Sequence, residues 1–471
     1  MNYFQTGGLN TYLSPLVSEG QLIHAVNVVS FPYGAKSKRT GYSTFLGTAD
    51  GAQVQSLHAF PNIGNDSTKV NLFRASGSAV YHSVQGTGAW TLSGNGTISA
   101  GAHFGGAILD NVFVGGDGVG SAQYSTNGTS FVDGTLGVAP IAGEFEEYQG
   151  RIYAAGTNST LFYSTHLNGR DWATSGTSDS SSFEIPGEGK LGKIFKAADK
   201  LIATKSTGLM YKWDGYSLID MSTKFGPSSP YSIGETEDYR FFINQMGHFG
   251  YGGSKPQLLS NPIQRQFYND KNSGIAGTVF PTAPGVCHRY DYLASVGTVV
   301  DDFTSRTISN AIIKYDYQKN EYLNWSFANK PTSWLSYNDA NSVRQLIFGD
   351  ASGQCYKMDN TVLTDNGSAI PMELVYVFTY GAPEFEKSWK YWRGVFNPGC
   401  EAKVQVACSN VFSYENLQWT DLGDTSNGFV EFRFPAGSQS RFLFVRIYEN
   451  SKNSRTVFLG QSVDAEIHEV K

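Results

Sequence analysis

Three groups of neighbouring carboxylates are the residues whose types and spacing could support acid–base chemistry: Glu144/Glu146/Glu147, Glu235/Glu237/Asp238 and Asp301/Asp302. Hydrolysis of a glycosidic bond needs two carboxyl groups about 5–10 Å apart, one of them with a raised pKa. The pair at 301–302 could also join a weak cation site, which would need more oxygen ligands than its neighbours in the sequence supply. Each group lies beside a predicted turn, so the sequence favours solvated loops over catalytic pairs.

Other residue types that commonly carry catalysis are scattered along the chain. The histidines form no HxH or HExxH pair, and there is no Gly-x-Ser-x-Gly elbow. The cysteines form no CxxC pair, so we expect unpaired thiols and no zinc site. The residues in question are His24, His58, His82, His103, His166, His248, His288 and His468, with Cys287, Cys355, Cys400 and Cys408. The sequence therefore predicts no catalytic residue, no metal ligand and no cofactor site, and we do not expect an enzyme.

Three glycine- or serine-rich stretches resemble the Asp-box or a phosphate loop, and we interpret all three as turns. Residues 124–131 and 163–172 resemble the Asp-box of sialidase-like propellers, Ser-x-Asp-x-Gly-x-x-aromatic, which is itself a structural turn away from the active site. The first is one residue short, with Asn127 in place of aspartate, and the second is longer. Residues 115–120 have the glycine content of a phosphate loop but lack its Lys-Ser/Thr pair. All three are expected to be hairpin turns.

A tyrosine recurs after a glycine or asparagine turn at a nearly constant interval. From Tyr81 to Tyr251 the steps are 43, 39, 48 and 40 residues, and a last step of 105 to Tyr356 leaves room for one more unit, which contains Tyr315. The intermediate markers are Tyr124, Tyr163 and Tyr211. A period near 40 with several short strands per unit is typical of β-propeller blades. We expect about seven, near 50–97, 98–138, 140–187, 188–228, 229–278, 279–329 and 330–368.

The composition predicts an all-β protein of three parts. Gly is abundant, at 53 of 471 residues, aromatic residues make up 14 % and charged residues only 16 %, and no stretch carries the apolar spacing of an amphipathic helix. Residues 1–48 lack the repeat and predict an extended arm, with a strand near 22–31 and a turn at 32–34. Residues 49–370 form the propeller. Residues 371–471 contain six or so strands, the size of a small β-sandwich.

The formal net charge of −6 gives the chain no general basic footprint for nucleic acid. The acidic excess lies in 49–370, which would let DNA slide along a channel that this region lined. The one basic cluster, Lys36-Ser37-Lys38-Arg39, could touch nucleic acid or an acidic partner, but a solvated or interface arm is favoured. The first residues resemble no signal peptide and no apolar run reaches membrane-spanning length, so we expect a soluble protein made in a cytoplasm.

The arm carries the residues of a family resemblance. It contains Gly8-Leu9-Asn10-Thr11, Ser14-Pro15-Leu16, Ala25-Val26-Asn27-Val28, Gly34-Ala35 and Lys38-Arg39-Thr40-Gly41-Tyr42. This order resembles the opening of many tailed-phage virion proteins. The layout of arm, propeller of about seven blades and terminal β-domain is similar to the tail nozzle proteins of short-tailed phages. The resemblance covers the whole chain in layout and the first 45 residues in motif.

The resemblance implies a structural virion protein, assembled in the host cytoplasm and located in the phage tail. It implies a homo-oligomeric ring, commonly six-fold, that forms the distal DNA-ejection conduit, contacts passing DNA without specificity and docks adaptor and fibre proteins. The insertion at 254–285 is a candidate gating loop or a surface loop. Two alternatives stay open: a carbohydrate-binding or glycan-cleaving propeller at the tail tip, and another position such as a head–tail connector or tail hub.

Overall fold

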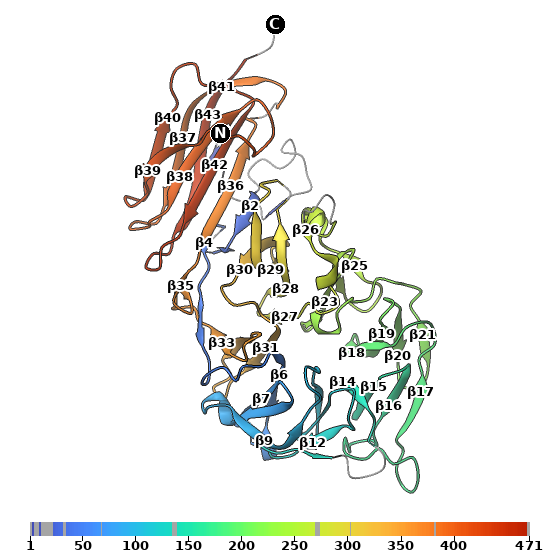
Figure 1. Cartoon of the computed structure of the whole chain (residues 1–471). Coiled ribbons are helices and arrows are strands. Elements are labelled where there is room, and N and C mark those ends of the chain that lie inside the picture. The colour runs from blue at the N-terminus through green and yellow to red at the C-terminus, as the bar shows by residue number, and fades with distance from the viewer. Residues whose placement is uncertain are drawn as a thin grey trace.

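The computed structural model describes residues 2–3, 9–10, 22–31, 34–66, 68–133, 139–268, 274–301, 303–380 and 383–468. The described residues form β-strands and a few single-turn 3₁₀ helices, so the all-β prediction is confirmed. Figure 1 shows a ring of small sheets with a separate stack of longer strands, β36 to β43, on one side. Several predicted elements of the arm, including Ser14-Pro15-Leu16 and the turn residues Pro32 and Tyr33, lie outside the described residues, as does Asp302.

Five four-stranded antiparallel sheets follow one another along the chain. They are β6 (Val54–Pro61), β7 (Val70–Ser76), β8 (Ala79–Ser83) and β9 (Thr91–Thr97); β10 (Gly105–Leu109), β11 (Val112–Gly116), β12 (Gln123–Ser125) and β13 (Val132–Asp133); β14 (Ala142–Tyr148), β15 (Arg151–Gly156), β16 (Thr160–Tyr163) and β17 (Ser181–Glu184); β18 (Leu191–Ala197), β19 (Lys200–Lys205), β20 (Met210–Trp213) and β21 (Leu218–Asp220); and β22 (Gly234–Glu235), β23 (Arg240–Asn244), β24 (Gly247–Tyr251) and β25 (Gln257–Leu258). These are blades 1 to 5 of a β-propeller.

Blade 6 is built from its own segment, whereas blade 7 takes a strand from the N-terminal arm. Blade 6 is β27 (Gly285–His288), β28 (Asp291–Val300), β29 (Thr307–Asp316) and β30 (Glu321–Ser326), with β26 (Gly274–Ile275) at the end of β28. Blade 7 is β31 (Ser333–Asn338), β32 (Arg344–Gly349) and β33 (Cys355–Met358), completed by the arm strand β5 (Tyr42–Thr44) and by β34 (Thr364–Asp365) and β35 (Ser368–Ala369). The last blade is therefore completed by a strand of the arm, which the sequence analysis placed outside the propeller.

The ring closes between blade 7 and blade 1. The innermost strands β31 and β6 are in contact, and the Thr332 hydroxyl donates a hydrogen bond to the Val54 carbonyl at 2.8 Å. All seven marker tyrosines lie in the third strand of their blades: Tyr81, Tyr124, Tyr163, Tyr211, Tyr251, Tyr315 and Tyr356. The predicted repeat of about seven units is confirmed. The predicted bounds differ from the structure at two places, since β5 of the arm belongs to blade 7 and β26 pairs with β28 of blade 6.

The C-terminal strands form two packed sheets. They are β36 (Met372–Phe378), β37 (Glu386–Phe396), β38 (Lys403–Ser409), β39 (Thr420–Asp424), β40 (Phe429–Arg433), β41 (Gln439–Ser440), β42 (Phe442–Glu449) and β43 (Val457–His468). One sheet contains β36, β42, β38 and β39, and the other contains β43, β37, β40 and β41. Trp392, Phe396 and Phe458 fill the space between them and belong to the same core as Tyr292 and Ile313 of blade 6. The two domains thus share one hydrophobic core.

The arm joins both domains. Its strands are β1 (Asn2–Tyr3), β2 (Leu22–Val26), β3 (Val28–Ser30) and β4 (Lys36–Lys38). β2 pairs antiparallel with β36 and, at Val26, parallel with β30, while β1 and β4 pair with β43. The strand expected near 22–31 is broken at Asn27, whose φ of 59° is a left-handed conformation that asparagine tolerates. The break sends β2 and β3 into different sheets.

Part of the described insertion at 254–285 packs on the core. Ile263, Phe267, Ile275 and Phe280 are buried in or beside the 3₁₀ helices η4 (Asn261–Gln266) and η5 (Gly277–Val279). The remaining 3₁₀ helices are η1 (Ile63–Asn65), η2 (Val84–Gly86) and η3 (Pro230–Ser232). This burial does not favour the gating loop considered for the segment.

Candidate functional site

Two of the predicted carboxylate groups lie on the innermost strands of the propeller. Glu144 and Glu146 are two residues apart in β14, and Glu235 ends β22. The prediction that these are solvated loop residues is wrong for Glu144, which is buried, and for Glu146, which is partly buried. Polar residues are common at the centre of a propeller because the innermost strands face a hydrated axis instead of another sheet. Glu237 is exposed in the turn after β22, as expected.

Around Glu144, side chains from four successive blades meet. The Lys193 ammonium, from β18 of blade 4, donates to the Glu144 carboxylate at 2.5 Å. His103, just before β10 of blade 2, lies 3.6 Å from the other Glu144 oxygen. The His103 ring stacks on Tyr231 of η3, which leads into blade 5, with centroids 4.0 Å apart. Side chains of four blades can touch only at the axis of the ring. We call His103, Glu144, Glu146, Lys193, Tyr231 and Glu235 the axial cluster.

The electrostatics of the axial cluster are those of several acids around one lysine. Burial raises the pKa of Glu144, and the Lys193 charge only partly opposes this. Burial and the Glu235 carboxylate raise the pKa of Glu146 to about 8. The pKa of Lys193 is also raised: burial lowers it, but the carboxylates of Glu144, Glu146 and Glu235 outweigh that effect. The cluster therefore holds one ammonium and at least one acid that keeps its proton near neutral pH.

A cavity of about 430 Å³ opens beside Glu144, His103 and Tyr231. Among the described residues there is no group of three His, Cys, Asp or Glu side chains that could hold a metal ion. The arrangement places charged side chains at the axis of the ring.

Replacing Glu146 with glutamine is expected to stabilise the protein at high pH. An acid whose pKa is raised on folding stabilises the fold below its unfolded value of 4.5, and this contribution is lost as the pH rises through about 8. The amide has no such loss. The free energy of unfolding of the parent should therefore fall relative to the Glu146→Gln variant between these values, as measured by urea denaturation at a series of pH values. The exposed Glu237→Gln variant is the control, and parallel curves for parent and Glu146→Gln would contradict the assignment.

His248 and His24 are buried and contact side chains that belong to the core of the fold. His248 is fully buried, stacks on Tyr292 at 4.7 Å and contacts the Tyr322 hydroxyl at 2.6 Å, and burial lowers its pKa to about 3. His24 of β2 lies 3.1 Å from the carboxylate of Asp301, which the sequence placed in a solvated loop. Burial opposes the charged imidazole, but Asp301 outweighs burial and the pKa of His24 is raised. This buried pair joins the arm to blade 6.

The basic cluster of the arm is neither solvated nor available to nucleic acid. Lys36, Lys38 and Arg39 are at most 2 % exposed. Lys36 pairs with Glu321 of blade 6, and Lys38 pairs with Glu449 of the sandwich at 3.1 Å. Of the solvated or interface arm that the sequence favoured, the solvated form is wrong, because carboxylates nearly 300 residues or more away in the sequence neutralise all three cations.

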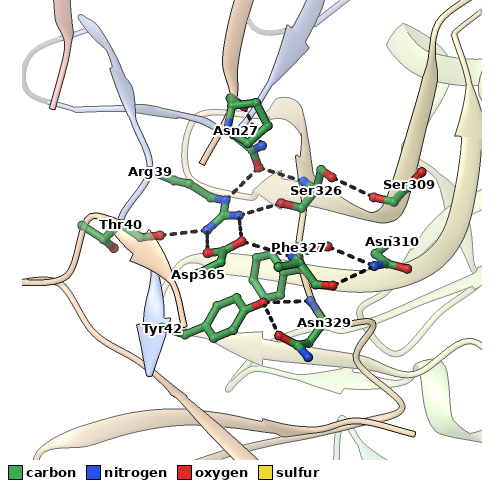
Figure 2. Close-up of polar contacts among 12 residues, drawn as sticks. Asn27, Arg39, Thr40, Tyr42, Ser309, Asn310, Ser326, Phe327, Asn329 and Asp365 are labelled. Carbon is green, nitrogen blue, oxygen red and sulfur yellow. Dashed lines mark hydrogen bonds and ion pairs between the residues drawn. The ribbon is translucent and has the colours of Figure 1, made fainter. Parts of the chain in front are cut away.

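Arg39 uses all five of its N–H groups. Two donate to the Asp365 carboxylate at 2.8 and 2.6 Å, one donates to the Asn27 side chain at 2.8 Å, and two donate to backbone carbonyls of residues 40 and 326. The guanidinium also lies 4.6 Å from the Phe327 ring centroid. Figure 2 shows these contacts, together with the hydrogen bonds of the Tyr42 hydroxyl to Asn329. We call Asn27, Arg39, Tyr42 and Asp365 the arm clamp.

Sequence patterns gave no sign of Lys193, the partner in the axial cluster, or of Asp365, the partner in the arm clamp. Nothing around Asp365 or Lys193 marks them, because each lies in an ordinary polar stretch and gains its role only through the folded ring. Asn27, Arg39 and Tyr42 of the clamp all lie in the segments on which the resemblance is based, so those segments did contain a signal for the clamp.

The stretches interpreted as turns are turns. Asp117 accepts hydrogen bonds from the amides of Val119 and Gly120 between β11 and β12, and Asn127 accepts from the amides of residues 129 and 130. Phe131 and Trp172 are the buried aromatics that close the two Asp-box-like hairpins. The four cysteines are unpaired, three of them buried. Among the described residues, none of the helices is long and apolar enough to cross a membrane.

No protein-family profile matches the chain, and no curated protein matches it. Two solved structures are similar at low identity. The computationally designed Ika8 protein is 12 % identical, with 75 % of this chain and 99 % of that chain covered and a TM-score of 0.41. YCF48 from Cyanidioschyzon merolae is 10 % identical, with 68 % and 98 % covered and a TM-score of 0.43. The assignment of the fold rests on the strand pairing of this chain itself.

Proposed function

We propose that this chain is a structural component of a phage tail, a nozzle-like oligomeric ring that forms the distal DNA-ejection conduit. The supporting observation is that arm residues in the segments that carry the resemblance make the contacts between the arm and the rest of the chain. Asn27, Arg39 and Tyr42, which lie in the segments that carry the resemblance to phage virion proteins, fix the arm to the propeller. Lys38 of the same run pairs with Glu449 of the sandwich. A subunit of a conduit has to keep its shape under load, and a shared core with buried ion pairs serves that purpose.

In this proposal the conduit lies between subunits and not along the propeller axis. The axial cluster places Lys193, Glu144, His103 and Tyr231 in contact across the axis, which leaves no passage for a duplex. A ring of about six subunits, with the acidic propellers around its opening, would let DNA slide without binding it. The protein would act by assembly, with adaptor and fibre proteins docked on its outer surfaces, and not by catalysis.

Light scattering and negative-stain microscopy of the purified protein test this proposal. The expected result is a closed ring of several subunits, about six by the resemblance, with a central hole, either alone or after mixing with the proteins encoded beside it. A protein that stays monomeric in both conditions would contradict the proposal. Binding or turnover of glycans by that monomer would support the tail-tip carbohydrate alternative.

A further inference from the structure

A cavity of about 670 Å³ lies where the arm, blade 6, blade 7 and the loop between β42 and β43 meet. We call it the junction pocket. Its floor is apolar: Leu293, Trp325 and Leu346 are buried and belong to one hydrophobic cluster, against which Val29 and Met358 pack. The pocket is therefore a rigid depression over a packed core.

Four cations surround this floor, and among the described residues none of them forms an ion pair. Arg289 and Arg344 are exposed, and Lys357 and Arg455 are half-buried. Arg344 donates to the Ser336 hydroxyl at 2.8 Å, and the charge of Lys357 helps to lower the pKa values of Asp339 and Asp359 nearby. This contrasts with the three cations of the arm, each of which has its own carboxylate.

The neighbouring histidine indicates the same positive potential. His288 lines the pocket, and burial together with the charges of Arg289 and Arg344 lowers its pKa to about 4. The two acids in the lining offset only part of this positive charge. Asp291 is paired with Lys314, and the hydrogen bonds of Thr361 together with the charge of Lys357 lower the pKa of Asp359.

We propose that the junction pocket binds an acidic peptide segment of a partner protein. Carboxylates of the segment would pair with Arg344 and Lys357, and an apolar side chain between them would cover Leu346 and Met358. Charge-assisted hydrogen bonds from arginine to carboxylate favour this ligand class. A nucleic acid is disfavoured because the cations are confined to one pocket of a chain whose net charge is −6, and a continuous row of phosphates needs a longer basic surface. The inference does not depend on whether the chain forms a ring.

Fluorescence anisotropy with a labelled peptide of four glutamates around one leucine tests the proposal on the full chain. We expect saturable binding that weakens with salt, and weakening of about tenfold or more in an Arg344→Glu/Lys357→Glu variant, because two charge-assisted contacts become repulsive. The matched control is Lys190→Glu/Lys224→Glu, which makes the same charge change on exposed side chains of blade 4 and its neighbouring loop. The peptide with glutamine in place of glutamate should not bind.

Three results would overturn the proposal: no binding of the glutamate peptide, equal loss in the pocket and control variants, or tighter binding of a thymidine oligonucleotide that the pocket variant abolishes. The last result would assign the pocket to phosphates. If the double variant does not fold, Arg289→Glu alone replaces it, since Arg289 is exposed in the turn between β27 and β28.

Discussion

Replacing Arg39 with methionine is expected to lower the free energy of unfolding by about 3–5 kcal/mol. The guanidinium is 1 % exposed and the side chain of Asp365 3 %, so the substitution leaves a carboxylate buried without its counter-charge. It also removes the donor to the Asn27 side chain and the contact with the Phe327 ring. Lysine cannot replace arginine here, because it cannot donate to both carboxylate oxygens in parallel and reach Asn27 and two carbonyls as well. Arg39→Lys should therefore also lose stability, though less than Arg39→Met.

Urea denaturation measures this loss, and the exposed pair Arg393–Glu431 provides the control. That pair has a comparable contact, with Nε and Oε2 2.5 Å apart, but both side chains are more than 40 % exposed. The free energy of unfolding of Arg393→Met should equal that of the parent within error, because solvent screens exposed ion pairs. Equal effects of Arg39→Met and Arg393→Met would show that burial of the clamp contributes nothing.

The repeat could be predicted because its signals are local. A turn, a short apolar run and a tyrosine at the same place in each blade are all visible within a window of a dozen residues, and each tyrosine does lie in a third strand. Blade 7 shows the limit of such reasoning. Its outer strand, β5, comes from 42–44, while the strand it pairs with is 355–358. No local pattern carries information about a partner more than 300 residues away.

The prediction that the carboxylates at 144 and 146 lie in solvated loops was wrong for a related reason. Glu144 and Glu146 have the i, i+2 spacing of one face of a strand, but their acidic setting favoured a loop, since charged residues rarely occupy the interior. What makes the position tolerable is the closed ring, which brings Lys193 and Glu235 from other blades to the axis. The charge of the arm was misjudged in the same way. Lys38 meets Glu449 only after both the propeller and the sandwich have formed.

Replacing Gly41 with alanine is expected to separate the arm strand β5 from β33 in blade 7 of the propeller. Gly41 lies between the clamp residue Arg39 and strand β5, and its amide donates to the Val362 carbonyl at 2.8 Å. A methyl group at this position would lie 1.9 Å from the Thr364 carbonyl oxygen and 2.5 Å from its carbon. These are backbone atoms of the segment that holds Asp365, so no flexible side chain can yield. To accommodate the methyl group, either β5 or the turn that holds Asp365 must move. Either movement draws Asp365 away from Arg39 and so breaks the arm clamp.

We expect a loss of at least about 3 kcal/mol in the free energy of unfolding, at or above the upper end of overpacking costs, because the clash and the loss of the clamp add. Hydrogen exchange locates the damage: the amide of Phe45, which donates to the Cys355 carbonyl at 2.8 Å beside the β5–β33 pair, should exchange faster. Gly88→Ala is the control, since that glycine is exposed with no atom within 4 Å of an added Cβ, and it should behave as the parent. Unchanged exchange at Phe45 in Gly41→Ala would mean that the arm does not hold blade 7 closed, and the shared core of blade 6 and sandwich would then have to keep the ring together.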